Sequence, residues 1–302
     1  MEAASAHVPV LLHEMLDLMR VMPHGTYVDA TFGRGGHSRA LLSGLAADGH
    51  LFVFDRDPDA LRSAYELAAQ DRRVTVVDAP FSHLDACGSR AIDGILFDVG
   101  ISSPQVDDPT RGFSFRHDGP LDMRMDPRAP GTAADWINTA EERELADVLW
   151  RYGDERRSRQ IARRIVEARR RAPLLTTIAL ADVVRACFPY KGGRIDAATR
   201  TFQALRIFIN DEIGELERAL EQALALLAVG GRLLVIAFHS LEDRLVKRRF
   251  RDLDQATRDN LERDDHRRFR LLARKAVQAS AAETALNPRA RSARLRALER
   301  CA

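Results

Sequence analysis

A glycine-rich turn near the N-terminus constrains the fold of this chain more than any other feature. Residues 26–30 form an apolar, strand-like run, and Gly33, Gly35 and Gly36 follow it directly. Residues 38–45 then have the pattern of a helix start. A strand, a glycine loop and a helix in this order allow bare backbone N–H groups to approach a ligand closely.

A second predicted strand indicates what that ligand is. Residues 50–55 are apolar and end in the carboxylate of Asp55. Doubly wound folds place an acid at about this distance, roughly twenty residues further on, to accept a hydrogen bond from a ribose hydroxyl. The alternative is that Asp55 only caps a helix. Together the two strands predict a nucleoside cofactor without saying which one.

Strands alternate with helices along much of the chain. A helix is predicted at residues 58–70, with Pro58 in its first turn. Further strands are predicted at residues 73–78, 91–98, 232–238, 269–277 and 292–300. This alternation predicts an α/β fold with a largely parallel sheet, and ligands bind such sheets at the carboxyl ends of the strands.

The middle of the chain breaks the alternation. Residues 100–130 are irregular, and a loop of that length is either functional or disordered; its aromatic and arginine residues favour function. Residues 132–188 have only helical patterns, with a predicted capping box at residues 139–142. We therefore expect an inserted all-helical subdomain, which divides the chain into parts 1–110, 111–198 and 199–302.

The C-terminal third returns to the α/β pattern. A long helix is predicted at residues 197–227, bent near residues 210–214, and Ser240 is expected to cap a later helix. A turn is expected at residues 189–193, and a charged loop at residues 258–268.

Composition narrows the class of protein. The chain has 302 residues, of which 45% are hydrophobic and 30% are charged, and this suits a soluble globular protein. Its three cysteines form no Cys-x-x-Cys pair, which suits a reducing compartment and argues against a cysteine metal site. No secretory signal is expected, and the most apolar stretch, residues 223–238, is interrupted by Gly230, Gly231 and Arg232. We expect a cytoplasmic protein without a membrane span and without a metal.

The positive charge is unevenly distributed although the net charge is only +2. Arginine clusters at residues 156–171, 244–251 and 289–300. The planar arginine side chain suits phosphate recognition. The alternative is that these residues form solvated helix faces.

Details of the turn and the strand order separate the candidate cofactors. The dinucleotide pattern requires a third glycine where Ser38 stands, whereas the early acid Asp29 and the looser glycine spacing favour S-adenosylmethionine. A turn without a ligand is the alternative. Phe81, after the third strand, either covers an adenine or packs in the core, and Asp98 ends the fourth strand as a cofactor-proximal acid or a turn former. The apolar fifth strand, followed by a helix and two late strands, favours a methyltransferase over a nicotinamide enzyme.

Several long motifs resemble one family, the bacterial small-subunit ribosomal RNA cytosine-N4 methyltransferases. The resemblance runs from His7 to the C-terminus, and its motifs lie at residues 31–38, 55–58, 98–105, 111–115, 119–126, 199–206, 238–244 and 287–292. It implies a Rossmann-like methyltransferase sheet, a 16S rRNA substrate within the small subunit, and methylation of N4 of a cytidine in the decoding region. It also implies that the helical insertion recognises RNA. The residues that it implies for S-adenosylmethionine binding are Gly35, Gly36, His37, Asp55, Phe81, Asp98 and Gln105.

The reaction suggests candidate catalytic residues. The exocyclic amine of cytosine is a weak nucleophile, and a site helps by accepting its N–H hydrogens and holding it near the methyl group. Many amino-methyltransferases use an Asp/Asn-Pro-Pro-aromatic loop after the fourth strand, but this chain lacks it. Asp98 is the first candidate acceptor, with Ser102 and Ser103 behind it.

Candidate RNA contacts come from three places. Arg111, Phe113 and Phe115 are candidates for base stacking or phosphate binding once the base leaves its stack. His239 ends the fifth strand and either faces the substrate or is a satisfied core residue. On the long helix Arg200, Gln203, Arg206 and Asn210 share a face, which suits an RNA cleft or an interdomain hydrogen-bond network.

Monomer and homodimer both remain open, as do two other functions: a non-catalytic RNA-binding assembly factor and a nucleotide-dependent oxidoreductase.

Overall fold

The computed structural model describes residues 9–188, 196–259 and 267–302. The chain divides into two compact units, the first comprising residues 1–100 and 213–302 and the second residues 101–212. The expected divisions after residues 110 and 198 both lie inside the second unit. The expected turn at residues 189–193 and most of the expected charged loop at residues 258–268 lie outside the described residues.

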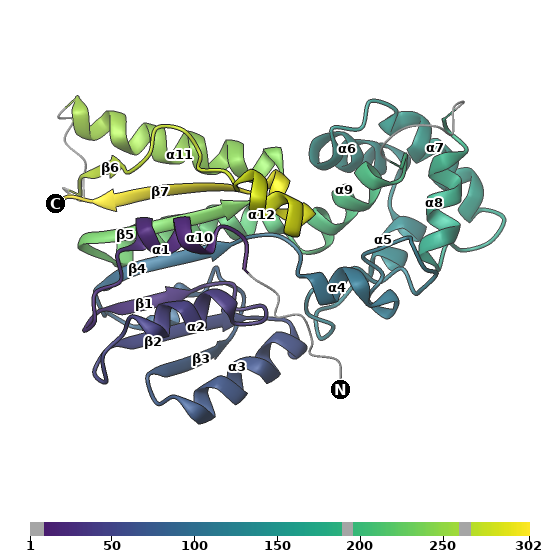
Figure 1. Cartoon of the computed structure of the whole chain (residues 1–302). Helices are drawn as coiled ribbons and strands as arrows, with labels where there is room; N and C mark the ends of the chain where they lie inside the picture. The colour runs from purple at the N-terminus through teal and green to yellow at the C-terminus, as the bar shows by residue number, and fades with distance from the viewer. Residues whose placement is uncertain (1–8, 189–195, 260–266) are drawn as a thin grey trace. The chain divides into compact units, whose positions relative to one another are not determined.

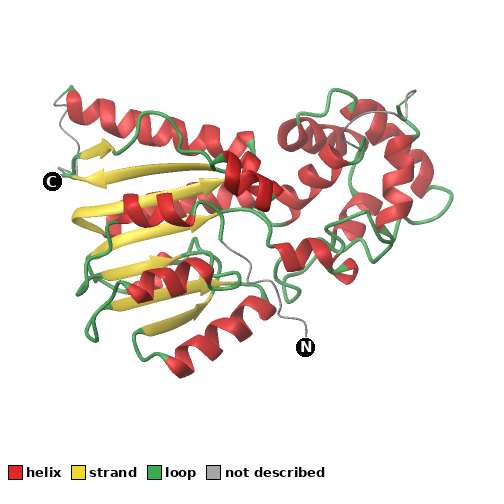
Figure 2. Ribbon diagram, viewed as in Figure 1, coloured by secondary structure: helices red, strands yellow, loops and turns green. Residues whose placement is uncertain are grey.

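The first unit is built on one seven-stranded sheet in the described part of the chain, with the order β3-β2-β1-β4-β5-β7-β6. Its strands are β1 (Thr26–Asp29), β2 (His50–Asp55), β3 (Val74–Asp78), β4 (Ile92–Asp98), β5 (Leu227–Ala237), β6 (Phe269–Leu271) and β7 (Arg294–Arg300). The five strands from β3 to β5 are parallel, and β7 pairs antiparallel with β5 and with β6. The predicted α/β class and parallel sheet are confirmed (Figure 2).

Helices cover both faces of this sheet (Figure 1). They are α1 (Leu12–Met19), α2 (Gly36–Ser43), α3 (Pro58–Gln70), α10 (Glu212–Leu226), α11 (Ser240–Arg258) and α12 (Ala281–Leu286), with short 3-10 turns η1 (Leu84–Cys87) and η3 (Pro288–Ser292). Apolar side chains of α1, α2 and α3 form one core with one face of the strands. Those of α10 and α11 form a second core with the other face, so the strands are buried on both sides and read as continuous apolar runs.

The second unit is helical throughout its described elements. They are α4 (Ser103–Asp107), the 3-10 turn η2 (Pro109–Arg111), α5 (Ala133–Thr139), α6 (Glu142–Gly153), α7 (Ser158–Arg169), α8 (Thr177–Arg185) and α9 (Thr199–Ile209). Because this unit lies in sequence between β4 and β5, the predicted inserted all-helical subdomain is confirmed. It has its own core, to which Phe113, Leu121 and Met123 from the expected irregular loop contribute.

Several local expectations were wrong. The capping box predicted at Thr139 does not exist, because Thr139 is the last residue of α5; the box is formed by Thr132 and Asp135 at the start of that helix. The predicted helix at residues 197–227 is two helices, although the break at Asp211, whose φ of 47° is left-handed, lies within the bend predicted at residues 210–214.

The predicted strand at residues 269–277 is only three residues long. Within it the N–H groups of Phe269 and Leu271 donate to Thr257 Oγ1 and Asp254 Oδ1 of α11, and the predicted pairing recurs only as an isolated bridge between Val277 and Leu295. Among the described helices, none is long and apolar enough to cross a membrane.

Candidate active site at the carboxyl edge of the sheet

The turn that follows β1 is fastened to both neighbouring strands. The N–H of Ala30 donates to the carbonyl of Leu96 on β4, and the N–H of Phe32 donates to the carbonyl of Phe54 on β2, both at 2.9 Å. The turn therefore lies at the carboxyl ends of three parallel strands, which is the ligand edge of such a sheet.

The three glycines of this turn serve different purposes. Gly33 and Gly35 have φ of 56° and 71°, which L side chains rarely adopt. A Cβ at Gly35 would also come within 2.5 Å of the Phe32 ring, whereas a Cβ at Gly33 would meet open space, with only the Thr31 carbonyl at 4.0 Å. At Gly36 the missing side chain makes room for Pro9, whose Cγ would lie 2.3 Å from a Cβ. The open side at Gly33 leaves the backbone accessible to a ligand.

Asp55 lies against this turn and organises it. Its Oδ2 accepts from the N–H of Gly33 at 2.9 Å, and its Oδ1 accepts from the N–H groups of Arg56 and Asp57 at 2.8 and 2.9 Å. Burial raises the pKa of Asp55 to about 6, although these donors oppose the rise. A carboxylate has about four acceptor positions, so one is left for a hydroxyl. The helix-cap alternative is wrong, because the cap of α3 is Asp57, which accepts from the N–H of Asp59.

Asp98 ends β4 and has unmet hydrogen-bonding capacity. Its N–H donates to Thr31 Oγ1 at 2.6 Å, which fixes its backbone to the turn. Its Oδ1 is buried and has no hydrogen-bond partner in the described residues. Burial raises the pKa of Asp98 to about 6; His37 lowers it, and the neighbouring carboxylates Asp29 and Glu242 raise it further. A buried carboxylate oxygen that has no hydrogen-bond donor suits a site in which a ligand supplies an N–H donor.

His37 lies between the turn and Asp98. It is in the first turn of α2 and only 6% exposed. Its Nε2 is 3.0 Å from the carbonyl of Val10, and its Nδ1 is 3.6 Å from Asp98 Oδ2. The N–H groups in the first turn of a helix have no partner within the helix, so this segment can also present donors to an anionic group.

Two further polar residues at this edge were not among the predicted site residues. Ser38 Oγ donates to Asp29 Oδ2 at 2.5 Å, and both side chains are buried. Burial raises the pKa of Asp29, with the Ser38 hydrogen bond opposing it. The sequence signal was available, since Asp29 ends a strand and Ser38 stands where a dinucleotide fold has glycine. The pair joins β1 to α2 and holds the turn between them.

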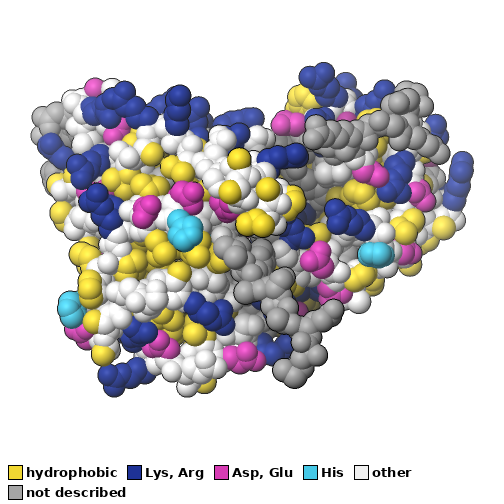
Figure 3. All heavy atoms as spheres, in the orientation of Figure 1, with side chains coloured by type: hydrophobic (Ala, Val, Ile, Leu, Met, Phe, Trp, Pro, Cys, Tyr) yellow, Lys and Arg dark blue, Asp and Glu magenta, His cyan; other side chains and the backbone are white. Residues whose placement is uncertain are grey.

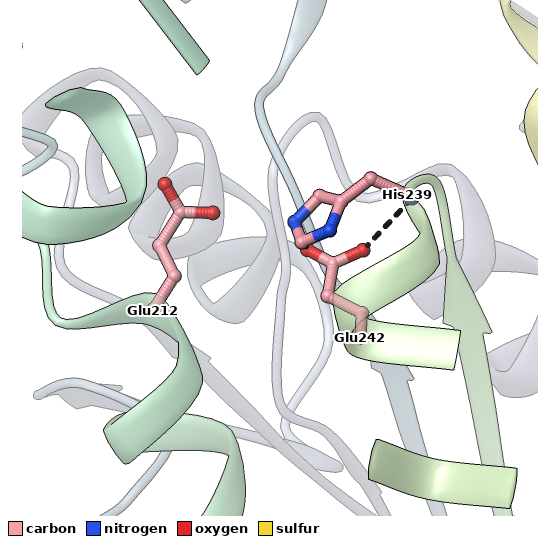
Figure 4. A group of neighbouring side chains, drawn as sticks. All are labelled: Glu212, His239 and Glu242. Carbon is pink, nitrogen blue, oxygen red and sulfur yellow. Dashed lines mark hydrogen bonds and ion pairs between the residues drawn. The ribbon is translucent and has the colours of Figure 1, made fainter. Parts of the chain in front are cut away.

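His239 and Glu242 lie at the end of β5 (Figure 4). His239, and not Ser240 as expected, is the cap residue of α11, and Glu242 Oε2 accepts from the N–H groups of Phe238 and His239 at 2.9 and 3.3 Å. His239 Nε2 is 2.8 Å from Glu242 Oε1, an ion-pair distance without hydrogen-bond direction. Neither ring nitrogen of His239 has a hydrogen-bond partner in the described residues, although Nε2 has this ion-pair contact. Both interpretations of His239 therefore stay predictions.

Phe81 has the core contact that one of its two interpretations predicts. Its ring is half-buried and meets Phe97 of β4 edge-on, with 5.7 Å between the centroids. Part of the Phe81 side chain is still exposed, so its function in covering an adenine stays a proposal.

The residues that follow β4 belong to the second unit, where they start a helix. Ser102 Oγ accepts from the N–H of Gln105, and Gln105 Oε1 accepts from the N–H of Ser102, so the two side chains form a capping box for α4. Ser103 is the first residue of that helix. These contacts give Ser102 and Gln105 a structural function that the sequence pattern did not predict.

The predicted stacking residues of the second unit are largely built into it. Phe113 is a buried core residue, 9% exposed, and so cannot stack on a base in this conformation. Phe115 meets Phe202 edge-on, with 4.7 Å between the ring centroids, and the Arg185 guanidinium carbon lies over the Phe115 ring at 5.5 Å from its centroid. Arg111 donates to the carbonyl of Met125 at 2.9 Å.

The polar face of α9 also has partners within the second unit. Gln203 donates to the carbonyl of Tyr152 and Arg200 to that of Asp154, both at 3.3 Å. Arg206 forms a two-pronged ion pair with Glu212 at 2.7 and 2.9 Å. These contacts form the hydrogen-bond network that was the alternative to an RNA cleft, but they lie inside one unit and not between two domains.

The first unit thus fits a nucleoside cofactor. It offers an open glycine turn, a carboxylate with one remaining acceptor position at Asp55, and a buried carboxylate oxygen without a partner at Asp98. Six of the seven expected cofactor residues lie in this unit, and Gln105 lies in the second.

Comparison with known proteins gives consistent matches over the whole chain. The profile of the MraW methylase family matches residues 4–301. A ribosomal RNA small subunit methyltransferase H from Rhodospirillum centenum is 50% identical over 310 residues, covering 99% of this chain and 93% of the relative. Proteins of the same name from Granulibacter bethesdensis and Alcanivorax borkumensis are 49% and 48% identical, covering 98% of this chain and 92% and 97% of their own lengths.

Proposed function

The chain belongs to the MraW methylase family, and we propose that it methylates the N4 amine of a cytidine in the decoding region of 16S rRNA, with S-adenosylmethionine as methyl donor. The names of its relatives support a small-subunit ribosomal RNA substrate. The observation that carries the proposal is the buried Asp98 Oδ1, which has no hydrogen-bond partner in the described residues.

S-adenosylmethionine, when bound, supplies a methyl group made electrophilic by its sulfonium. In the first unit its binding residues would be Gly35, Gly36, His37, Asp55, Phe81 and Asp98. Asp55 suits a ribose hydroxyl because its carboxylate has an acceptor position left after three backbone N–H groups. The turn at Gly33 suits a group that needs close approach to backbone, since the nearest atom that a Cβ there would meet among the described residues is the Thr31 carbonyl oxygen, at 4.0 Å.

Asp98 is the residue that we assign to the amine. The lone pair of the cytosine amine is delocalised into the ring, so the nitrogen is a poor nucleophile. An N–H of the amine, directed at Asp98 Oδ1, meets an acceptor that already lies in a low-dielectric position and needs little reorganisation. As the new N–C bond forms and the methyl leaves the sulfur, the amine nitrogen becomes acidic, and the carboxylate can take its proton and release it to solvent.

The base must be unstacked before the amine can reach a buried carboxylate. His239 is the described residue of the first unit best suited to meet it, because its ring nitrogens have no hydrogen-bond partner in the described residues and it follows β5, the strand next to β4. Ser102, Ser103, Arg111, Phe115, Arg200, Gln203 and Arg206 remain proposed substrate or catalytic residues, although the positions and contacts described above already give them structural functions.

The direct test is product identification. The full chain is incubated with methyl-labelled S-adenosylmethionine and undermethylated small subunits or naked 16S rRNA. Label is then located by mass spectrometry of nuclease fragments and nucleosides. Label in N4-methylcytidine from a decoding-region fragment is the expected result. Label in another nucleoside, or in another region, would overturn the assigned acceptor.

Asp98→Asn separates the enzyme from its two rivals. We expect this variant to lose methyl transfer and to keep RNA binding, whereas an RNA-binding assembly factor would show no transfer with either protein. Binding of NAD in place of S-adenosylmethionine would favour the oxidoreductase. Asp48→Asn is a matched control, because Asp48 is exposed and lies in the loop before β2, at the amino-terminal edge of the sheet.

A further inference from the structure

We propose that His37 is a positioning residue that keeps Asp98 in its charged, hydrogen-accepting form. The inference rests on the proposed function for what Asp98 does, and on the structure for how His37 acts. It assigns to the His37 side chain an electrostatic function that is separate from contact with the cofactor.

The His37 ring is held at both nitrogens. It is buried, with Nε2 at 3.0 Å from the carbonyl oxygen of Val10 and Nδ1 at 3.6 Å from Asp98 Oδ2. The hydrogen bond to Val10 holds the ring, and its second nitrogen lies within ion-pair range of the carboxylate, although beyond hydrogen-bond distance. Side chains on two elements, β4 and α2, are thereby joined at the edge where the ligand is expected.

These contacts determine where the ring hydrogens lie. A carbonyl oxygen can only accept, so Nε2 must carry a hydrogen. In a neutral ring Nδ1 would then be a bare lone pair facing a carboxylate, and the two would repel. The arrangement is favourable only if Nδ1 also carries a hydrogen, or if Asp98 is protonated. In the favourable arrangement, one proton therefore lies either on His37 Nδ1 or on Asp98.

The surroundings decide how much Asp98 depends on this proton. The charged groups that face it are Asp29 from β1, Glu242 from α11 and His37 from α2. Burial favours protonation of Asp98 most, the two carboxylates add to this, and His37 is the group that opposes them. Without His37 the carboxyl of Asp98 would hold its proton at higher pH, and a protonated carboxyl cannot accept the proton of the amine.

A pH profile tests this because a purely structural role would not move it. His37→Gln keeps an N–H that can reach the Val10 carbonyl but cannot carry the charge. We expect the acid limb of kcat/KM for methyl transfer, which reports the free enzyme, to move to higher pH by about one to three pH units, with activity recovering in alkaline buffer. Equal loss at every pH, with the limb unmoved, would overturn the proposal.

A matched variant controls for the substitution itself. His24 also faces a carboxylate, with Nδ1 at 2.7 Å from Asp48 Oδ1. Both side chains are exposed, His24 to 73% and Asp48 to 70%. His24→Gln should leave both the limb and the rate unchanged. A shift of the limb in this variant as large as that in His37→Gln would overturn the proposal.

A second measurement is independent of the reaction. In the full chain without ligands, the side-chain carboxyl carbons of 13C-labelled aspartates are followed by NMR, with the Asp98 signal assigned from its loss in Asp98→Asn. The Asp98 midpoint should lie at higher pH in His37→Gln than in the unaltered protein, and an unchanged midpoint would overturn the proposal. If His37→Gln does not fold, 15N shifts of the unaltered protein at pH 7 decide instead: a His37 ring with a bare Nδ1 beside a charged Asp98 would overturn it.

The two proposals fail separately. If the labelled product is not N4-methylcytidine but the Asp98 midpoint still moves, the function assigned to the amine falls and the function assigned to His37 stands. If the product is N4-methylcytidine but the Asp98 midpoint does not move, the function assigned to the amine stands and the function assigned to His37 falls.

Discussion

Asp98 in the first unit and Asn210 in the second are both polar side chains in well-packed surroundings, but their hydrogen bonding is opposite. One oxygen of Asp98 is buried without a partner in the described residues. Asn210 accepts from the N–H of Met125 and donates to the carbonyls of Met123 and Arg206, at 2.7 to 2.9 Å. The sequence pattern placed both residues in candidate binding sites, and the structure separates them.

The difference is informative because an unmet buried acceptor is costly. Leaving a buried polar group without a partner costs about 1–3 kcal/mol, and more for a charge. A fold retains such a group where a ligand completes it. A residue whose side-chain oxygen and both amide hydrogens have partners, as at Asn210, is explained by stability alone. The unmet oxygen of Asp98 therefore supports the proposal that the first unit's strand edge is the chemical site.

Asp98→Asn should give the largest effect. We expect kcat for methyl transfer to fall by about 100- to 1000-fold, because the substituted amide cannot take the amine proton and accepts its hydrogen bond more weakly. The thermal unfolding temperature should stay the same or rise, since a buried charge beside Asp29 and Glu242 is removed. Single-turnover rates and calorimetry measure the two quantities.

A large fall in the unfolding temperature of this variant would break the comparison, because Asp98 would then be a stabilising residue like Asn210. Asp48→Asn, exposed and distant along the strands, should change neither quantity.

Asn210→Ala should have the opposite profile. It removes the three hydrogen bonds that Asn210 forms with Met125, Met123 and Arg206 in the core of the second unit. At roughly 1 kcal/mol for each bond, we expect a loss of about 2–3 kcal/mol in the free energy of unfolding. Urea denaturation measures this, with the exposed Gln160→Ala as the control in the same unit. Unchanged stability together with lost RNA binding would instead make Asn210 part of an RNA site.

The sequence predicted those parts of the fold that local pattern decides. The helix at Pro58–Gln70 was predicted with its bounds, because a proline in the first turn and an amphipathic repeat define it. Strands β1 to β4 were found to within one or two residues because buried parallel strands are continuous apolar runs. Asp55 and Asp98 followed from the same pattern, since each ends a strand.

Long-range pairing was not predictable in the same way. Asn210 bonds to Met125, 85 residues earlier in the chain, and no local pattern indicates that interaction. The cap of α11 was assigned to Ser240 because serine is a favoured cap, but Glu242 reaches back to the N–H of His239 and moves the start by one residue. Phe113 resembled an exposed loop aromatic until its neighbours in the core were known.

The pH dependence of stability sharpens the comparison further. Burial raises the pKa of Asp98 to about 6, so the folded protein binds this proton more tightly than the unfolded chain does. A carboxyl group whose pKa is raised on folding lowers the free energy of unfolding when it is ionised. This loss of stability is complete above the folded pKa and disappears as the pH falls towards 4. Asp98→Asn should be more stable than the unaltered protein by about 1–2 kcal/mol at pH 8, after allowance for partial solvent exposure, and equal to it near pH 4.

Urea denaturation of both proteins across this pH range measures the difference. Methyl transfer by the unaltered protein should fall over the same interval, as pH drops through about 6, because Asp55 and Asp98 both titrate there. A stability difference that does not change with pH would show that Asp98 is already paired in the folded protein.

The smallest expected effect compares one basic helix from each unit. On α7 and in the residues before it, Arg156 and Arg159 are exposed and form no ion pair with the described residues. Arg163 has one distant ion pair, with 4.0 Å between its Nε and Glu142 Oε1. On α11 Lys247, Arg248 and Arg251 are also exposed, and Lys and Arg side chains line the part of the molecular edge where this helix lies (Figure 3). There, however, Asp252 lies 3.9 Å from Arg248 and 3.1 Å from Arg251.

Since an acid already neutralises part of the α11 charge, we expect the α7 side to contribute more to RNA phosphate binding. Replacing the three α7-side arginines by glutamine should weaken 16S rRNA binding and reduce the slope of log affinity against log salt by about 2, at roughly 0.7 for each phosphate that is no longer neutralised. Replacing the three α11 residues should reduce it by less. Filter binding between low and physiological salt measures both slopes. Slopes that match the unaltered protein in both variants would mean that these helices present solvated faces, and that RNA affinity comes from groups nearer the unpaired oxygen of Asp98.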